Sequence, residues 1–315
     1  MLFTNLEFDQ EQRNRMRALS APDEVYFGDP EQTPEADREA FLKAEIAFGW
    51  CPPEWLAEAG ALRWMQFDSV GIGEYAQLDW DRLSRRLVRT NLRGFFAEPV
   101  AETVLAGILA LYRGIDRLVD LKPRQAWMKL TLRPQLKTLA NAAVVLVGHG
   151  ALGQRLRVLL LPFGCRVTAY DQFAEGADLT QLEELDAVLP DADIVCTALP
   201  DTPATRGLFG KKRFDLMQAG AIFVNVGRGS LVDESVLAEY LLSGRLGGAV
   251  LDVTDQEPLP CEHPLWQCPH TILTQHTAEG SFDELDRKIT FFAENLRRYR
   301  QGLSLENVIN WTRGF

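Results

Sequence analysis

The chain of 315 residues lacks the features that mark several large protein classes. It has no run of basic residues longer than Lys211-Lys212-Arg213, and its formal net charge is −11. It therefore lacks the electrostatic footprint of a protein that binds nucleic acid or an anionic membrane. The longest apolar stretch of helical character, residues 103–112, is too short to cross a bilayer, and the first residues show no secretion signal. We therefore expect no nucleic-acid partner, no membrane partner and a cytoplasmic location.

Cysteine and histidine are also scarce. The five cysteines are scattered and form no CxxC pair, a pattern that favours reduced, mostly structural thiols. Cys261 and Cys268 flank Glu262 and His263, but this spacing matches no standard ligand pattern, so we predict no metal site. With four histidines in the chain, few side chains are candidates for proton transfer near neutral pH.

The most informative motif lies at residues 144–153, where the apolar run VVLV leads into GHGALG. Gly148, Gly150 and Gly153 form a GxGxxG fingerprint between a predicted strand and a predicted helix over 151–163. The first glycine makes the tight turn, the second lets the backbone approach a pyrophosphate, and the third lets the helix pack on the strand. Ala151 and Leu152 belong to the same predicted cofactor contact. The alternative is a tight strand–helix turn without a ligand.

An acid stands where this type of site needs one. Asp171 follows the apolar run 167–170, 18 residues after Gly153. A carboxylate there accepts from the ribose 2′-hydroxyl of NAD and repels the 2′-phosphate of NADP. No arginine follows directly to hold that phosphate, so we expect NAD, with NADP less favoured. An ordinary strand-end acid in a turn is the alternative.

The alternation of apolar strands and amphipathic helices predicts an α/β protein with two domains. Six strands, expected at 143–147, 166–170, 193–198, 221–226, 248–251 and 271–274, indicate a Rossmann-type, doubly wound parallel sheet. A smaller set at 25–27, 44–48, 62–67 and 86–89, with helices at 10–19 and 53–59, indicates a flavodoxin-like α/β domain. A long helix opens at Glu98-Pro99, with apolar residues on one face as far as Val119, and an amphipathic helix spans 282–300. We expect residues 1–97 and 284–315 to form a discontinuous substrate domain, and 98–283 to form the NAD-binding domain.

Ligands of open α/β sheets bind beyond the carboxyl ends of the strands, and three polar groups follow successive strands there. Arg228 follows the fourth strand of the large sheet, Glu257 the fifth and His276 the sixth. Reduction of a 2-oxo acid needs a proton donor, and His276 would be that donor. Glu257 would orient it and favour its protonated form. Arg228 would bind the substrate carboxylate. Each residue also has an alternative without a catalytic role. Arg228 would then be a surface arginine, Glu257 a solvated loop acid, and His276 a buried histidine whose hydrogen bonds are made within the protein.

The chain resembles the D-isomer-specific 2-hydroxyacid dehydrogenases over nearly its whole length. The motifs that carry the resemblance are LPDTPAT at 199–205, FVNVGRGSLVDE at 223–234, LDV at 251–253 leading to Glu257-Pro258, and PLW at 264–266. The family's catalytic Arg, Glu and His fall on Arg228, Glu257 and His276. The glutamate argues against the similar formate dehydrogenases, which carry Gln there. Gln275 replaces the family's usual Pro, and Glu279 stands where a small residue is common.

The same resemblance implies further contacts. It assigns the cofactor to Pro200, Thr205, Val226, Asp252 and Thr103. It also implies that the loop Val70-Gly71-Ile72 binds the substrate carboxylate through its backbone N–H groups, beside Arg228.

The sequence thus predicts an oxidoreductase that transfers a hydride between NAD(H) and a small 2-oxo or D-2-hydroxy acid. On overall resemblance we expect a reductase of glyoxylate- or hydroxypyruvate-like substrates. The alternative is an NAD(H)-sensing binding protein without turnover on the same fold. The resemblance also implies a homodimer formed through the cofactor domain.

Overall fold

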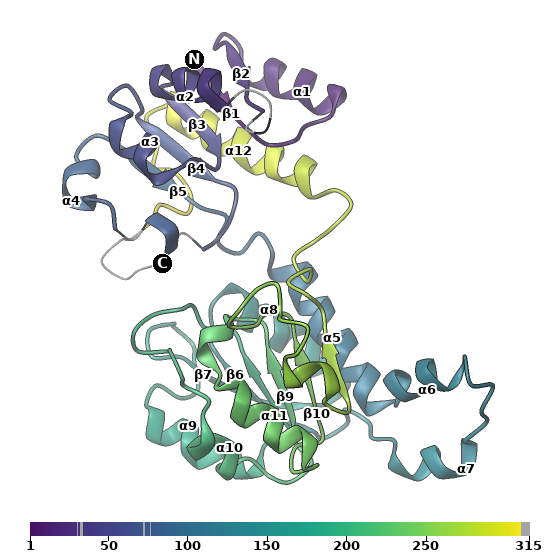
Figure 1. Cartoon of the computed structure of the whole chain (residues 1–315). Helices are drawn as coiled ribbons and strands as arrows, with labels where there is room; N and C mark the ends of the chain where they lie inside the picture. Colours follow the sequence, from purple (N-terminus) through teal and green to yellow (C-terminus); the bar gives the residue numbers. More distant parts are fainter. Residues whose placement is uncertain (30, 32–33, 72, 76, 310–315) are drawn as a thin grey trace. The chain divides into compact units, whose positions relative to one another are not determined.

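The computed structural model describes residues 1–29, 31, 34–71, 73–75 and 77–309, and the chain divides into two compact units (Figure 1). Unit 1 combines Met1–Arg93 with the C-terminal residues from Ser281, and unit 2 is Gly94–Gly280. The divisions at 93/94 and 280/281 fall four and three residues before the expected 97/98 and 283/284. Each unit contains its own parallel sheet, which confirms the predicted α/β fold class.

Unit 1 is built on a five-stranded parallel sheet in the order β2-β1-β3-β4-β5, the order of the flavodoxin-like fold. Its strands are β1 (Leu2–Thr4), β2 (Val25–Phe27), β3 (Ile46–Gly49), β4 (Trp64–Phe67) and β5 (Val88–Thr90). Its helices are α1 (Gln10–Ser20), α2 (Pro34–Lys43), α3 (Pro53–Glu58), the 3₁₀ turn η1 (Gly73–Tyr75), α4 (Trp80–Leu83) and α12 (Glu284–Arg300). The sequence did not predict β1 or α2, and β5 starts two residues later than expected.

Both faces of this sheet are buried. Side chains that alternate along the strands pack on one face with α2 and α3, and on the other face with α1 and α12. On the second face, Phe292 of α12 stacks on Phe48, with ring centres 4.5 Å apart, and on Trp64 at 5.1 Å. The C-terminal helix is therefore part of the hydrophobic core of unit 1.

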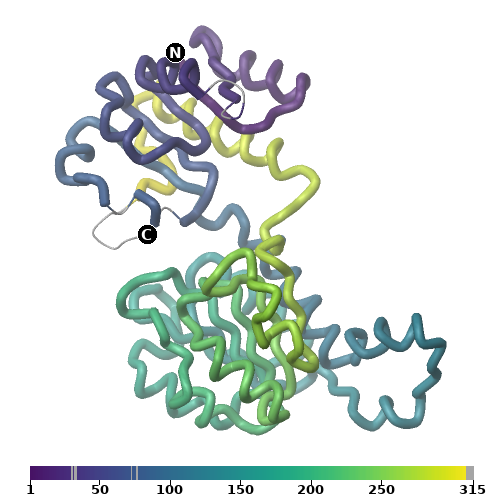
Figure 2. The backbone as a smooth tube through the Cα atoms, viewed as in Figure 1, coloured from purple at the N-terminus to yellow at the C-terminus, as the bar shows by residue number. Residues whose placement is uncertain are grey.

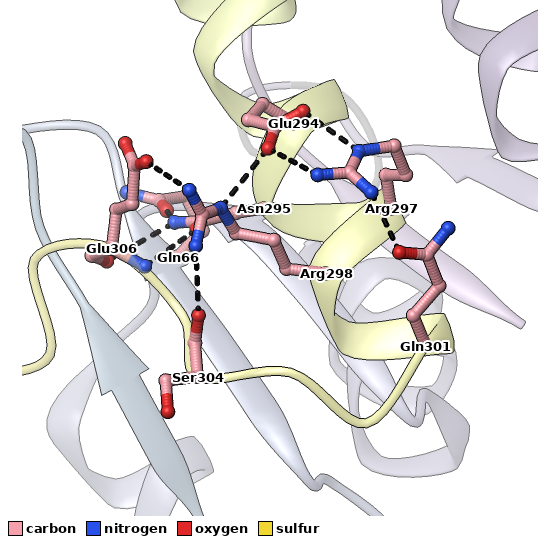
Figure 3. A network of polar contacts seen from close by, with 8 residues as sticks. All are labelled: Gln66, Glu294, Asn295, Arg297, Arg298, Gln301, Ser304 and Glu306. Carbon is pink, nitrogen blue, oxygen red and sulfur yellow. Dashed lines mark hydrogen bonds and ion pairs between the residues drawn. The ribbon is translucent and has the colours of Figure 1, made fainter.

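A buried polar network fixes this C-terminal segment (Figure 3). The amide nitrogen of Asn295 donates to the side chain of Gln66 and to the carbonyl of Glu306, both at 3.2 Å. The carbonyl oxygen of Asn295 accepts from the N–H of Glu306 at 2.8 Å. Figure 2 shows the yellow C-terminal trace lying along the purple and blue N-terminal segments. Unit 1 is thus discontinuous in sequence.

Unit 2 is built on a six-stranded parallel sheet in the order β11-β10-β9-β8-β6-β7. Its strands are β6 (Ala143–Val147), β7 (Arg166–Tyr170), β8 (Ile194–Thr197), β9 (Ile222–Asn225), β10 (Gly248–Leu251) and β11 (Thr271–Leu273). All six predicted strands are present within one or two residues. The strand order reverses between β6 and β8, which is the switch point where ligands bind in this architecture.

Helices cover both faces of the unit 2 sheet. One apolar core lies under α5 (Ala97–Tyr112) and α8 (Ala151–Leu160). The other lies under α9 (Leu182–Val188), α10 (Lys211–Leu216) and α11 (Glu234–Leu242). The side chain of Asp233 caps α11 by accepting from the N–H of Val236. Short 3₁₀ turns complete the unit: η2 (Arg133–Gln135), η3 (Leu161–Phe163), η4 (Leu189–Asp191), η5 (Gly229–Leu231) and η6 (Pro264–Gln267).

The expectation of one long helix from Pro99 to Val119 is wrong. Helix α5 ends at Tyr112, and the chain turns at Gly114, whose φ of +63° is a left-handed conformation that favours glycine. Residues 115–135 then form α6 (Ile115–Leu121), α7 (Lys129–Leu132) and η2, which we call the arm. In Figure 1, α6 and α7 stand off from the sheet of unit 2.

Two features are absent from the described residues. No helix there is both long and apolar enough to cross a membrane. Within the same residues, no group of three or more His, Cys, Asp and Glu side chains is arranged to hold a metal ion. All five cysteines are free, and four of them are buried.

Candidate active site

The glycine loop has the geometry that a dinucleotide needs. Gly148 has a φ of +118°, and a Cβ there would lie 2.8 Å from the carbonyl oxygen of Ala198. A Cβ on Gly153 would lie 2.0 Å from the carbonyl oxygen of Gly148, so α8 approaches the loop as only glycine allows. A Cβ on Gly150 would meet nothing within 4 Å. The loop is thus closed where it packs on the protein and open at the second glycine, where backbone can approach a ligand.

The amino end of α8 faces that open position. Gly150 is its N-cap, and no side chain caps the helix, so the first N–H groups, including those of Ala151 and Leu152, remain for a ligand. Helix N-termini of this kind bind phosphate groups. The residues of unit 2 therefore fit the pyrophosphate of a nicotinamide dinucleotide.

Asp171 lies directly beside this loop, at the end of β7. Its carboxylate accepts from the N–H of His149 at 2.8 Å, and from those of Phe173 and Ala174, both at 2.9 Å. The acid thus ties the glycine loop to the turn after β7. His149 itself is buried (6% exposed), and its Nδ1 has no hydrogen-bond partner among the described residues.

The other predicted cofactor residues occupy different settings. The hydroxyl of Thr205 donates to the carbonyl of Pro200 at 2.6 Å and closes the turn after β8, beside the switch point. Val226 is buried at the end of β9. Thr103 is half-buried on α5, and its cofactor contact stays a prediction.

Arg228 follows β9 at the carboxyl edge of the sheet, in a turn organised by Asn225. The side chain of Asn225, 1% exposed, accepts from the hydroxyl of Thr197 at 2.8 Å and from the N–H of Gly227 at 3.1 Å. Its amide donates to the carbonyl of Arg228 at 3.0 Å. The sequence reasoning missed Asn225, although a polar side chain at the end of a buried strand has to find partners and so signals a structural role.

Glu257 and His276 are brought together, as predicted from their places after neighbouring strands. Nδ1 of His276 lies 2.6 Å from Oε2 of Glu257. The other carboxylate oxygen of Glu257 accepts from the N–H of Thr254 at 3.0 Å. Because Nδ1 is engaged, Nε2 is the ring nitrogen left for a substrate. Both side chains are about two-fifths exposed, so a small molecule can reach the pair.

The backbone around His276 adopts an uncommon turn. Gln275 and His276 have φ values of +55° and +54°, and the N–H of Thr277 donates to the carbonyl of Thr274 at 3.1 Å. Positive φ at both central residues defines a type I′ turn, which Gly, Asn and Asp usually form. Proline, with φ fixed near −65°, cannot adopt this conformation. Gln275, in place of the family's usual Pro, is therefore compatible with the turn that carries His276.

Asp252 holds this turn in place. Its carbonyl accepts from the N–H of His276 at 2.6 Å. One oxygen of its carboxylate accepts from the hydroxyl of Thr274 at 2.5 Å and from the N–H groups of Thr277 and Ala278, both at 3.1 Å. Asp252 is 6% exposed, so these bonds form away from bulk water. The family resemblance assigned Asp252 to the cofactor, and that contact stays a prediction. In the structure, the carboxylate of Asp252 binds the turn that carries His276.

The loops of Arg228 and Glu257 pack directly against each other. A Cβ on Gly229 would lie 2.0 Å from the carbonyl carbon of Thr254, so glycine alone permits this approach. Glu234 stabilises the loop of Glu257, because its carboxylate accepts from the N–H of Asp255 at 2.8 Å. Burial raises the pKa of Glu234, the bond from Asp255 opposes this, and the charges of Asp255 and Glu257 raise it further. Gly229 and Glu234 thus help to position the loop that carries Glu257, and the sequence analysis did not predict this role for either residue.

The predicted substrate loop lies in unit 1, after β4. The carbonyl of Val70 accepts from the side chain of Asn91 at 3.1 Å, and that of Gly71 accepts from the hydroxyl of Ser69 at 2.8 Å. Both residues are exposed. Ile72 lies outside the described residues. The binding of a substrate carboxylate by this loop stays a prediction.

The comparison with protein families gives one match over more than half of the chain. The model of the D-isomer-specific 2-hydroxyacid dehydrogenase NAD-binding domain matches residues 105–278. Among curated proteins, the glyoxylate/hydroxypyruvate reductase B of Salmonella schwarzengrund is 32% identical over 268 residues, which are 81% of this chain and 80% of that protein.

Solved structures give the same result. A D-isomer-specific 2-hydroxyacid dehydrogenase from Xanthobacter autotrophicus, in complex with NADPH and MES, matches with a TM-score of 0.81 and 26% identity, over 100% of this chain and 99% of that chain. An NADPH-dependent glyoxylate/hydroxypyruvate reductase from Sinorhizobium meliloti, in complex with NADP and sulfate, matches with a TM-score of 0.83 and 25% identity, again over 100% and 99%.

Proposed function

The chain belongs to the D-isomer-specific 2-hydroxyacid dehydrogenases, and we propose that it acts as an NADH-dependent reductase of a small 2-oxo acid such as glyoxylate or hydroxypyruvate. The observation that carries the proposal is the 2.6 Å contact between His276 and Glu257, held at the sheet edge where Arg228 also lies. Nothing in the comparisons supports the alternative of a sensor without turnover.

The bound nicotinamide supplies the hydride that reaches C2 of the oxo acid. Arg228 binds the substrate carboxylate through its planar guanidinium, which suits a two-point contact. His276 delivers a proton from Nε2 to the substrate oxygen as it becomes a hydroxyl. Glu257 holds the ring through Nδ1 and fixes its direction. In the reverse reaction His276 accepts the same proton.

Oxidation of NADH, followed by absorbance at 340 nm across a panel of 2-oxo acids, tests this function. His276→Gln is expected to lower kcat by at least about 100-fold, the range that a positioned acid contributes. His270→Gln is the matched control, because His270 also pairs with a carboxylate, Asp116, but lies at the amino ends of the strands. Absence of turnover on every acid while NADH still binds would exclude a reductase. Equal effects of the two variants would remove His276 from the mechanism.

We further propose that NADH is preferred over NADPH. Asp171 stands beside the glycine loop, and residues 172–176 add the acid Glu175 and no basic residue that could hold a 2′-phosphate. The Sinorhizobium and Xanthobacter neighbours were solved with NADP or NADPH, so the test has to compare both cofactors. Fluorescence titration should give tighter binding of NADH. Asp171→Asn should reduce the difference in affinity between NADH and NADPH. The remote variant Asp191→Asn should leave that difference unchanged. Tighter binding of NADPH to the wild type would overturn the preference.

We also propose that the chain forms a homodimer through the arm of unit 2, in line with the family's usual assembly. Large apolar side chains are unusually exposed there, and such a patch on a folded protein marks an interaction surface. They are Ile115 (48% exposed), Leu118 (49%), Val119 (62%), Trp127 (90%), Met128 (41%) and Leu130 (83%).

Sedimentation or light scattering tests the assembly. The double variant Trp127→Ser, Leu130→Ser is expected to shift the protein toward monomer. Leu242→Ser, which removes a 54% exposed leucine from α11, should leave the dimer intact. A monomeric wild type, or a double variant that dimerises as before, would refute the proposal.

A further inference from the structure

A cavity of about 260 Å³ lies in unit 2, away from the residues of the proposed reaction. Three of its lining residues lie one or two positions before strands β9, β10 and β11, namely Gly220, Gly247 and His270. These are the amino ends of the same three strands whose carboxyl ends carry Arg228, Glu257 and His276. The cavity is therefore separated from the catalytic edge by the full length of the strands.

Basic side chains dominate its charged lining. Arg117, Lys137 and His270 contribute to the wall, together with Tyr112 and Gln135. Among the described residues, no carboxylate lies within 4.0 Å of the charged groups of Arg117 or Lys137. In a chain with a net charge of −11, two cations that line one cavity and form no ion pair are an unusual arrangement.

The partners that these cations do have are neutral. Arg117 donates from Nη1 to the side chain of Gln135 at 2.6 Å, and Lys137 donates to the carbonyl of Gly220 at 3.2 Å. The ammonium of Lys137 also lies 5.7 Å from the ring centre of Tyr112. Within the described part of the chain, Nε of Arg117 is buried and has no hydrogen-bond partner. A buried guanidinium N–H without an acceptor indicates a group that awaits a ligand or water.

His270 also lines the cavity, and Asp116 fixes the direction of its ring. Nδ1 of His270 lies 2.8 Å from Oδ2 of Asp116, so Nε2 is the nitrogen left for other partners. Two carboxylates lie in this region. Asp116 contacts His270, and burial together with the nearby charge of Asp193 raises the pKa of Tyr112. Among the described residues, neither carboxylate forms an ion pair with Arg117 or Lys137.

We propose that this cavity is a binding site for a small anion that presents a phosphate or carboxylate group. Arg117 and Lys137 are its donors, and His270 lines it. Oxyanions of this type satisfy several N–H donors at once, which a single neutral acceptor such as Gln135 cannot do. No substrate or cofactor contact proposed above uses these residues, so the site is separate from the reaction.

Occupancy of the site has a structural consequence. Arg117 lies on α6 and Gln135 on η2, at the two ends of the arm, whereas Gly220 and His270 belong to the body of unit 2. An anion held by Arg117 and Lys137 against the cavity wall would connect the base of the arm to the body. Binding is therefore expected to slow cleavage of the arm by trypsin after its exposed residues Arg124 and Lys129, compared at one protein concentration so that assembly through the arm is the same in every sample.

The test titrates inorganic phosphate and, separately, malonate by calorimetry at constant ionic strength. Saturating NADH is present so that the glycine loop is already occupied. We expect one anion in this cavity beside any that occupies the proposed substrate site at Arg228, and a comparison of the two titrations tells whether phosphate or carboxylate is preferred. Arg117→Gln and Lys137→Gln should each weaken binding by about tenfold or more, because each removes one full charge from the site. Lys129→Gln, an exposed arm variant that does not line the cavity, should bind as the wild type does.

Trypsin digestion provides the second measurement, and circular dichroism checks that the variants are folded. The anion should protect the arm in the wild type and not in folded Lys137→Gln. If Lys137→Gln does not fold, Arg117→Gln takes its place. Absence of binding by both anions would overturn the proposal. So would binding that neither Arg117→Gln nor Lys137→Gln weakens, because the anion would then lie elsewhere.

Discussion

Replacement of Gln275 by proline is expected to misplace His276 while leaving cofactor binding largely intact. The φ of Gln275 is +55°, whereas proline is held near −65°, so the backbone would have to rotate by about 120°. That rotation is incompatible with the type I′ turn. The turn hydrogen bond and the bonds from His276, Thr277 and Ala278 to Asp252 all depend on this conformation.

The magnitude follows from these contacts. Each backbone hydrogen bond contributes about 0.5–1.5 kcal/mol net, and a bond to a charged carboxylate about 1.5–3 kcal/mol. Loss of the turn bond and of one bond to the Asp252 carboxylate therefore costs about 2–4.5 kcal/mol locally, enough to reorganise the loop. A displacement of about 1 Å in a catalytic group lowers the rate by about 100-fold. We expect kcat of Gln275→Pro to fall by at least this factor.

Gln275→Gly is the matched control. Glycine adopts positive φ without strain, so the turn should persist and stability should change by no more than about 1 kcal/mol. Steady-state kinetics give kcat and KM, and NADH fluorescence gives the Kd of the cofactor. The expected pattern is a loss of kcat in the proline variant alone, with NADH affinity unchanged in both. Wild-type kcat in Gln275→Pro, or an equal loss in Gln275→Gly, would refute the role of the turn.

Three further substitutions probe other contacts. Gly153→Ala places a Cβ 2.0 Å from a loop carbonyl, so it should weaken NADH binding and lower the Tm, and an unchanged Kd would contradict the close packing of α8. Asp233→Ala removes the α11 cap and should cost about 1 kcal/mol in urea unfolding at pH 7, whereas Asp233→Asn should cost less. Hydrogen bonds from Ser235 and Val236 lower the pKa of Asp233, so this contribution is present above the unfolded pKa near 3.9 and is lost as pH falls through the lower folded value. The difference in the free energy of unfolding between the wild type and the alanine variant should therefore become smaller below about pH 4. Phe292→Ala should destabilise unit 1 by about 3–5 kcal/mol, and a loss below about 1 kcal/mol would contradict its place in the core.

The sequence predicted most of unit 2 because its strands are continuous apolar runs, as expected for a parallel sheet covered on both faces. The secondary structure of unit 1 was harder to predict from the sequence. Strand β1 has three residues and β5 also has three, which is too short for a period-two pattern to emerge. The end of α5 was missed because its apolar face continues into α6, and the break depends on the single left-handed residue Gly114.

In the candidate site, too, the contacts that follow from the sequence pattern were predictable, whereas the local backbone conformation was not. Glu257 and His276 were predicted to meet because the ends of adjacent parallel strands share an edge. The turn at 275–276 was not predictable, because neither Gln nor His signals positive φ in a sequence. The contact between Asp116 and His270 spans 154 residues and involves no motif, so it emerges only from the fold.

The discontinuity of unit 1 has a consequence for the order of events during synthesis. Leu2, Ile46, Phe48 and Trp64 emerge from the ribosome within the first third of the chain, but their covering helix, with Phe292, emerges near the end. At about 5–20 residues per second, this delay is on the order of 10–40 seconds. During that interval the nascent sheet exposes an apolar face, while unit 2, which is contiguous, can complete its own core. The nascent chain is therefore expected to depend on a holding chaperone until α12 has been translated.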